Sequence, residues 1–266
     1  MYDRYNRKIN YLRISVTDRC NLRCVYCMPE EGVTLLDHKD ILTFDEIVKV
    51  TETAVRKGID KVRLTGGEPL VRKGIVELVK MIGKIDGIKD YSMTTNAILL
   101  GRYAQDLADA GLHRVNISLD TLNAEKFRQI TRGGDIQKVF DGIKAAKKAG
   151  LEPVKINCVI KESRTEPDAV EVANYCRENN LMVRFIKEMD LETGSFSVVQ
   201  GGSGGDCAHC NRLRLTSDGK IKPCLFSDMG YSVRELGAER AIDLAIGNKP
   251  VSGHTNLTGK FYNIGG

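Results

Sequence analysis

Short β-rich runs alternate with helical patterns along the first 190 residues, and this alternation constrains the fold more than any other feature. Six strands are predicted, near residues 11–16, 61–65, 91–94, 113–118, 154–160 and 182–186. Helical patterns lie between them, at about 43–57, 72–85, 100–110, 135–149 and 166–179. Strands joined by helical crossovers pair in parallel, so we predict an α/β fold. A doubly wound sheet and a barrel both fit this pattern.

Local signals mark where several of these helices begin and end. Thr43 and Glu46 have the spacing of a capping box, which predicts a helix that starts after Thr43. Three glycines each follow a helical run and can take the left-handed position there: Gly58, Gly111 and Gly150. Ligands of parallel sheets gather at the carboxyl ends of the strands, so we expect the functional residues in those loops.

Composition excludes several classes of protein. No apolar run approaches the roughly 20 residues that a membrane span needs. The net charge of +5 suits an anionic small molecule and is too weak to indicate nucleic acid. Residues 1–8 lack the apolar stretch of a secretory signal, so we expect a cytoplasmic protein whose thiols stay reduced.

The cysteines carry the strongest chemical signal. Six of the eight form two groups: Cys20, Cys24 and Cys27 (the N-terminal triad) and Cys207, Cys210 and Cys224 (the C-terminal triad). A structural zinc ion takes four ligands, whereas three thiolates on a four-iron cluster leave one iron open for substrate. For the C-terminal triad a zinc site with His209 as fourth ligand stays open. Cys158 and Cys176 stand alone in predicted elements and are expected in the core.

The stretch from Ser15 to Pro29, around the N-terminal triad, resembles the radical S-adenosylmethionine enzymes. Leu64-Thr65-Gly66-Gly67-Glu68-Pro69-Leu70 is similar to the methionine-binding turn of that superfamily. Within it, the chain most resembles the GTP 3′,8-cyclases of molybdenum-cofactor biosynthesis, the MoaA family. The stretches that support this narrower resemblance are Cys207–Gly219, Pro223-Cys224-Leu225, Lys249-Pro250 and the terminal Gly265-Gly266.

The resemblance implies a fold and an activity. The fold is an incomplete (β/α)6 TIM-type barrel with a small C-terminal domain that carries a second iron–sulfur cluster. The activity is the conversion of GTP to 3′,8-cyclo-7,8-dihydro-GTP, the first step of molybdopterin biosynthesis. A radical derived from S-adenosylmethionine removes the 3′ hydrogen of GTP, a C–H that no side-chain base can ionise.

The resemblance also implies cofactors, partners and site residues. The two triads would each hold a 4Fe–4S cluster, and the first would bind S-adenosylmethionine. Partners are an external electron donor, a downstream cyclic pyranopterin monophosphate synthase and a second copy in a homodimer. Four residues are assigned to S-adenosylmethionine: Tyr26, Gly67, Ser118 and Met189.

The candidate GTP-binding residues are mostly cations, because GTP is a polyanion. The sequence contains no P-loop motif, so binding of the phosphates by such a loop is excluded. Guanidinium groups suit phosphate oxygens, and residues two apart in a strand share one face. The candidates are Arg13, Arg63, Thr94, Lys155, Arg212, Leu213 and Arg214. The resemblance adds the tail, Gly265 and Gly266, which would reach into the same pocket.

The chain departs from the family pattern between Met189 and the C-terminal triad, where relatives carry several tens of residues. Gly201-Gly202-Ser203-Gly204-Gly205 has the composition of a flexible linker and resembles an engineered replacement. We therefore divide the chain into a partial barrel over 1–190, a shortened connection over 191–205 and a cluster- and GTP-binding segment over 206–266. Two other functions stay open: a different radical S-adenosylmethionine enzyme, such as a peptide-modifying maturase, and a non-enzymatic zinc-binding module.

Overall fold

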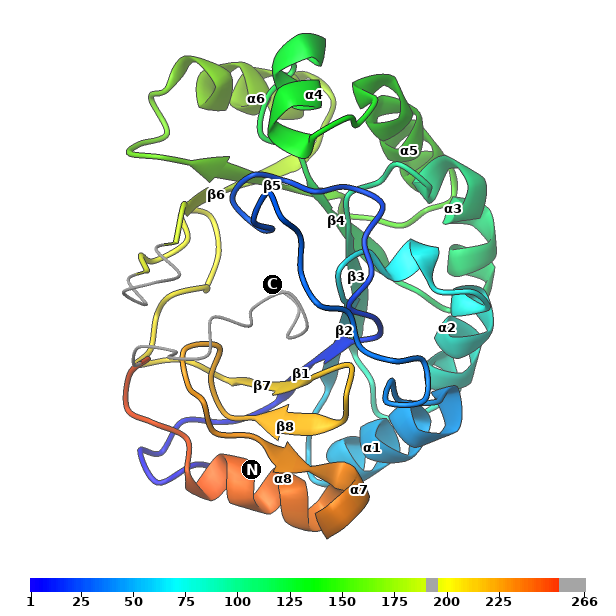
Figure 1. The fold of residues 1–266 in the computed structure, drawn as a ribbon, viewed down its shortest axis with the longest axis vertical. Coiled ribbons are helices and arrows are strands. Elements are labelled where there is room, and N and C mark those ends of the chain that lie inside the picture. Colours follow the sequence, from blue (N-terminus) through cyan, green and yellow to red (C-terminus); the bar gives the residue numbers. More distant parts are fainter. Residues whose placement is uncertain (190–195, 254–266) are drawn as a thin grey trace.

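A single curved sheet organises the computed structural model, which describes residues 1–189 and 196–253 (Figure 1). Its strand order is β6-β5-β4-β3-β2-β1-β7-β8-β9. The first six strands are β1 (Tyr11–Ser15), β2 (Lys61–Thr65), β3 (Asp90–Thr95), β4 (Arg114–Ser118), β5 (Lys155–Ile160) and β6 (Met182–Lys187). They pair in parallel, as predicted.

Helices cover the outer, convex side of this sheet (Figure 1). They are α1 (Phe44–Arg56), α2 (Ile75–Gly83), α3 (Leu100–Asp109), α4 (Ala124–Thr131), α5 (Ile136–Lys148) and α6 (Pro167–Glu178). In the described residues β6 and β9 do not pair, so the sheet curls without closing. The incomplete barrel is therefore confirmed, and the doubly wound alternative, which needs helices on both faces, is wrong.

The C-terminal residues extend this sheet and do not build a separate one. β7 (Arg212–Leu215) pairs in parallel with β1, and β8 (Lys220–Lys222) and β9 (Tyr231–Ser232) follow in antiparallel order. Helices α7 (Val233–Leu236) and α8 (Ala238–Gly247) follow β9, and α8 packs beside α1. The segment that carries the C-terminal triad is thus part of the barrel wall.

The two faces of the strands differ in character. Residues that point outward are apolar and fully buried against the helices, as with Leu12 and Ile14 on β1 and Val62 and Leu64 on β2. Parallel strands in α/β proteins normally read as continuous apolar runs because both faces are covered. Here the residues between, such as Arg13, are polar because they face a cavity.

Several local predictions are confirmed. The Thr43 side chain accepts from Glu46 N at 3.2 Å, and Glu46 Oε2 accepts from Thr43 N at 2.7 Å, which completes the capping box. Gly58, Gly111 and Gly150 have φ values of 99°, 96° and 75°, which favour glycine at those helix ends. Helices α4, α7 and α8 and strands β7, β8 and β9 were not predicted.

The described part of the glycine-rich connection lies on the edge of β6. Phe185 and Gln200 exchange two backbone hydrogen bonds of 3.0 Å, and Val199 N donates to Gly204 O at 2.8 Å. Pairing of this kind satisfies backbone groups that an exposed edge strand leaves open. The residues expected to form a flexible linker thus form a defined turn.

Among the described helices, none is both long enough and apolar enough to cross a bilayer.

We predict that Thr43→Ala lowers the free energy of unfolding by about 1 kcal/mol, because the backbone amide of Glu46 in the first turn of α1 loses its acceptor. Urea unfolding followed by circular dichroism measures this change. Glu52→Ala, at an exposed position inside α1, is the matched control and should stay within about 0.5 kcal/mol of the parent. Equal losses in the two variants would contradict the role of the cap.

Candidate functional site

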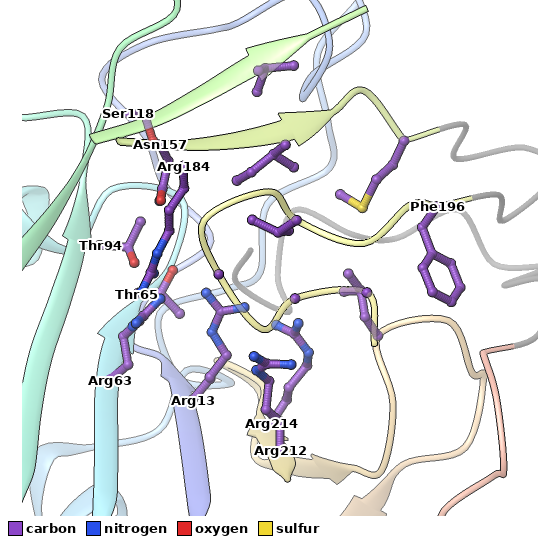
Figure 2. Close-up of a pocket in the computed structure, with 18 of the residues that line it drawn as sticks. Arg13, Arg63, Thr65, Thr94, Ser118, Asn157, Arg184, Phe196, Arg212 and Arg214 are labelled. Atoms are coloured by element: carbon purple, nitrogen blue, oxygen red, sulfur yellow. The ribbon is translucent and has the colours of Figure 1, made fainter. Parts of the chain in front are cut away.

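A cavity of about 590 Å³ lies on the inner face of the sheet. Side chains from all seven parallel strands line it, and the cysteines of both triads reach it from the loops. Figure 2 shows the basic side chains of β1, β2, β6 and β7 pointing into this space. Segments nearly 200 residues apart in sequence thus contribute to one site.

The loop that carries the N-terminal triad is fixed by the turn after β2. Gly67 N donates to Thr17 O and Glu68 N donates to Arg19 O, each at 2.8 Å. A Cβ atom on Gly67 would lie 2.3 Å from Arg19 O, so no other residue fits without moving the loop. We expected the missing side chain of Gly67 to leave room for S-adenosylmethionine. The atoms nearest to that position instead belong to the backbone of Arg19, which directly precedes Cys20.

The three thiols of the N-terminal triad lie close enough to influence one another. Burial, together with the charge of Cys27, raises the pKa of Cys20 to about 11 and that of Cys24 to about 12. Leu22 N lies 3.4 Å from Cys20 Sγ and Asn96 Nδ2 lies 3.8 Å from it. Metal binding releases protons from such thiols, so these cysteines would bind a cluster as thiolates.

Two buried carboxylates support this loop. Glu68 is 1% exposed and accepts from Leu70 N, Thr95 Oγ1 and Asn96 N at 2.7–3.0 Å. Burial nevertheless raises the pKa of Glu68 to about 7. The second carboxylate, Asp120, accepts from the Tyr26 hydroxyl at 2.7 Å and from a backbone amide of β5. Tyr26 was predicted as a contact to adenine, and its hydroxyl in addition anchors the loop to β4.

The C-terminal triad lines the opposite part of the same cavity. His209, the candidate fourth ligand of a zinc site, pairs with Asp206 at 2.8 Å, and 83% of its side chain is exposed. Within residues 1–189 and 196–253, no three His, Cys, Asp or Glu side chains are close enough to hold a single metal ion. A four-iron cluster spaces its ligands more widely than one ion does, so the triads fit a cluster better.

Three arginines on neighbouring strands form what we call the arginine ladder: Arg214 on β7, Arg13 on β1 and Arg63 on β2. The register places Arg13 directly opposite both others. Burial and mutual repulsion lower the pKa of Arg13 and of Arg63 to about 9, which leaves both charged at neutral pH. Like charges directly opposite each other destabilise a sheet, so the ladder implies an anionic ligand.

Unpartnered polar atoms point to the same ligand class. Five buried side-chain atoms find no hydrogen-bond partner in the described chain: Tyr11 Oη, Arg13 Nε, Thr94 Oγ1, Arg184 Nε and Ser217 Oγ. All of these residues except Ser217 line the cavity. Buried donors without acceptors are rare in folded proteins and indicate a bound group. A polyphosphate supplies the acceptors and the negative charge together.

Most residues predicted for the site lie in this cavity. They are Arg13, Cys20, Cys24, Tyr26, Cys27, Arg63, Gly67, Thr94, Ser118, Lys155, Met189, Cys207, Cys210, Arg212, Arg214 and Cys224. Leu213 differs, because its side chain is fully buried in the core on the other face of β7. Gly265 and Gly266 lie outside the described residues.

Sequence reasoning missed Arg184 and Asn157, which also line the cavity (Figure 2). Both follow from the register of the sheet: Ser118 lies opposite Asn157, and Asn157 lies opposite Arg184. This register is set by long-range pairing, so no local sequence pattern marked the two residues.

Two family descriptions match the chain. Residues 14–176 match the radical SAM superfamily, and residues 156–249 match the molybdenum cofactor synthesis C family. The chain is 43% identical to a GTP 3′,8-cyclase of Thermodesulfovibrio yellowstonii, over 89% of this chain and 88% of the relative. It is 45% identical to the GTP 3′,8-cyclase of Alkaliphilus oremlandii, over 86% and 84%.

A third relative bears on the shortened connection. The GTP 3′,8-cyclase of Listeria monocytogenes is 41% identical over 300 aligned positions, more than the 266 residues of this chain, so the alignment opens gaps here. Among solved structures, SuiB of Streptococcus suis bound to S-adenosylmethionine has a TM-score of 0.65 at 16% identity. That match covers 92% of this chain and 65% of SuiB, and it shows the fold alone.

The two family matches together span residues 14–249, which include both triads, and the chain belongs to the GTP 3′,8-cyclase family of the radical S-adenosylmethionine superfamily.

Proposed function

We propose that the cavity binds S-adenosylmethionine and GTP side by side and converts GTP to 3′,8-cyclo-7,8-dihydro-GTP. The observation that carries this proposal is that both thiol triads and the arginine ladder open into one space. Separate pockets would not bring a radical source to the sugar of a nucleotide. GTP 3′,8-cyclase activity in the relatives supports the same reaction.

We assign the N-terminal triad to the 4Fe–4S cluster that binds S-adenosylmethionine. Gly67, Ser118, Tyr26 and Met189 are the residues proposed to surround that cofactor, and all four line the cavity beside the triad. When bound, the cluster and S-adenosylmethionine supply a carbon radical that can remove the 3′ hydrogen of GTP. The chain contributes position and shielding from water, since the sheet and its loops surround the site.

We assign the phosphates of GTP to cations that the strands present. Arg13, Arg63, Arg184 and Lys155 lie on four different strands, and guanidinium forks match phosphate oxygens. Neighbouring cations and burial lower the pKa of Lys155 to about 8, an effect that a bound phosphate reverses. Thr94 adds a buried hydroxyl that is still without a partner.

We assign the guanine end of GTP to the part of the cavity formed by the C-terminal triad. Arg212 and Arg214 line the cavity from alternate positions of β7, directly after Cys210. Cys207, Cys210 and Cys224 would hold a second 4Fe–4S cluster there, and with only three protein ligands that cluster would have an iron available to bind the base. Leu213 contributes to this site through its backbone, because its side chain lies in the core.

The external electron donor, the downstream cyclic pyranopterin monophosphate synthase and the homodimer stay predictions. Cleavage of S-adenosylmethionine consumes one electron, which supports an external donor. The peptide-modifying maturase is the weaker reading, because the likeness to SuiB rests on 16% identity while several GTP 3′,8-cyclases share more than 40%.

Anaerobic incubation with GTP, S-adenosylmethionine and dithionite tests the proposal. We expect 5′-deoxyadenosine together with a cyclised nucleotide, both identified by mass spectrometry. Cys24→Ala should abolish both products, because the first cluster loses a ligand. Formation of 5′-deoxyadenosine without any nucleotide product, or only when a peptide is added, would refute the GTP reaction.

Arg13→Met should weaken nucleotide binding and yet stabilise the protein in the absence of nucleotide. Removing the central cation of the ladder relieves repulsion of about 1 kcal/mol or more, which corresponds to a rise in Tm of about 2–4 °C. Thermal unfolding with and without GTP or tripolyphosphate measures both effects. Arg128→Met, at an exposed position of α4, is the control. A lower Tm of Arg13→Met without nucleotide would contradict the repulsion argument.

A further inference from the structure

Lys249 lies at the end of α8 and is 2% exposed, although it carries a flexible ammonium group. Its Nζ donates to Arg212 O at 2.8 Å and to Pro223 O at 2.5 Å. The thiols of Cys210 and Cys224 lie close enough to interact electrostatically with this ammonium group. Two of its three N–H donors are taken by backbone carbonyl groups. Lys249 is therefore held in one position and not merely covered.

These contacts tie together the parts of the chain that carry two of the three C-terminal thiols. Pro223 directly precedes Cys224, and Arg212 begins β7 two residues after Cys210. A single side chain thus spans both cysteines and the start of the strand that carries the substrate arginines. Lys249 itself lies 26 residues or more from both acceptors in the sequence.

A second buried cation supports the same arrangement from the N-terminus. Arg7 is 7% exposed and donates to Cys207 O at 2.8 Å, to Pro250 O at 2.7 Å and to Val251 O at 3.0 Å. Its Nε pairs with Asp3 at 2.7 Å. Arg7 thus holds Cys207, the cysteine of the triad that Lys249 does not reach, and also the two residues that follow Lys249.

The side chains around the two triads differ in charge. The carboxyl groups of Glu68 and Asp120 support the loop of the N-terminal triad. At the C-terminal triad, the buried ammonium group of Lys249 is held at Arg212 and Pro223, within two residues of Cys210 and Cys224. A cation beside the sulfur ligands stabilises added negative charge there, and a carboxylate does not.

We propose that Lys249 is a positioning residue that holds the C-terminal triad in its ligating arrangement and raises the reduction potential of the cluster bound there above that of the N-terminal cluster. Net charge and hydrogen bonds to the sulfurs are among the factors that set the potential of an iron–sulfur cluster. Residues that contact the ligands also govern how tightly a metal site is held. The inference rests on the proposed assignment of the C-terminal triad as cluster ligands.

Two substitutions separate charge from hydrogen bonding. Lys249→Gln removes the charge and keeps N–H donors, and Lys249→Met removes both at similar length. Lys220→Met is the matched control, because Lys220 lies on β8 of the same segment with 54% of its side chain exposed. All variants are reconstituted anaerobically, and the potentials of both clusters are measured by redox titration with electron paramagnetic resonance.

We expect Lys249→Gln to lower the reduction potential of the C-terminal cluster by at least 59 mV, which corresponds to a tenfold change in the one-electron equilibrium constant. The N-terminal cluster should keep its potential, and Lys220→Met should change neither. An unchanged C-terminal potential in Lys249→Gln, or equal shifts of both clusters, would overturn the proposal.

Iron content gives an independent readout if a variant cannot hold the C-terminal cluster. The parent should bind about eight irons per chain, as two four-iron clusters do. Lys249→Met should lose iron to a chelator until about four remain, while the parent and Lys220→Met retain theirs. Retention of all iron by Lys249→Met would contradict the positioning role. A parent that binds only four irons would instead refute the assignment of the C-terminal triad, whatever the variants do.

Discussion

The arginine ladder places three positive charges on neighbouring parallel strands, and the rest of the structure must stabilise this arrangement. Arg13 lies directly opposite Arg63 and Arg214, so like charges face one another across the centre of the sheet. The outward faces of the same strands are fully apolar, and Leu12 and Ile14 pack beneath the helices without exposure. Burial of the apolar outer face thus stabilises a sheet whose inner face carries repelling charges. A polyanion bound on the inner face would relieve that repulsion.

The continuous sheet explains how two thiol triads far apart in sequence come to share one cavity. β1 leads into the loop of the N-terminal triad, and β7 lies between Cys210 and Cys224 of the C-terminal triad. Because β1 and β7 pair in parallel, the register that aligns Arg13 with Arg214 also fixes the separation of the triads. The radical source, the nucleotide site and the second cluster are therefore positioned by one set of backbone hydrogen bonds.

The parts of the fold that local sequence controls were predictable, and the parts that long-range contacts control were not. Alternating apolar patterns located β1 to β6, and the capping box at Thr43 located the start of α1. β7 to β9 are two to four residues long and form because β1 offers an edge, which no local pattern reports. Arg184 was missed for the same reason, since its role depends on the register with Asn157.

The shortened connection over 191–205 precedes the C-terminal triad in sequence, but other contacts determine the geometry of that triad. β7 is held by β1 along four residue pairs, and Lys249 and Arg7 fix the segments on either side of it. None of these contacts involves the glycine-rich turn, which rests on the edge of β6. The turn does reach the cavity, where Ser203 accepts two hydrogen bonds from the Arg212 guanidinium, at 2.7 and 3.1 Å. A phosphate or base that binds Arg212 must displace Ser203, so the connection modulates access to the site while the sheet determines its geometry.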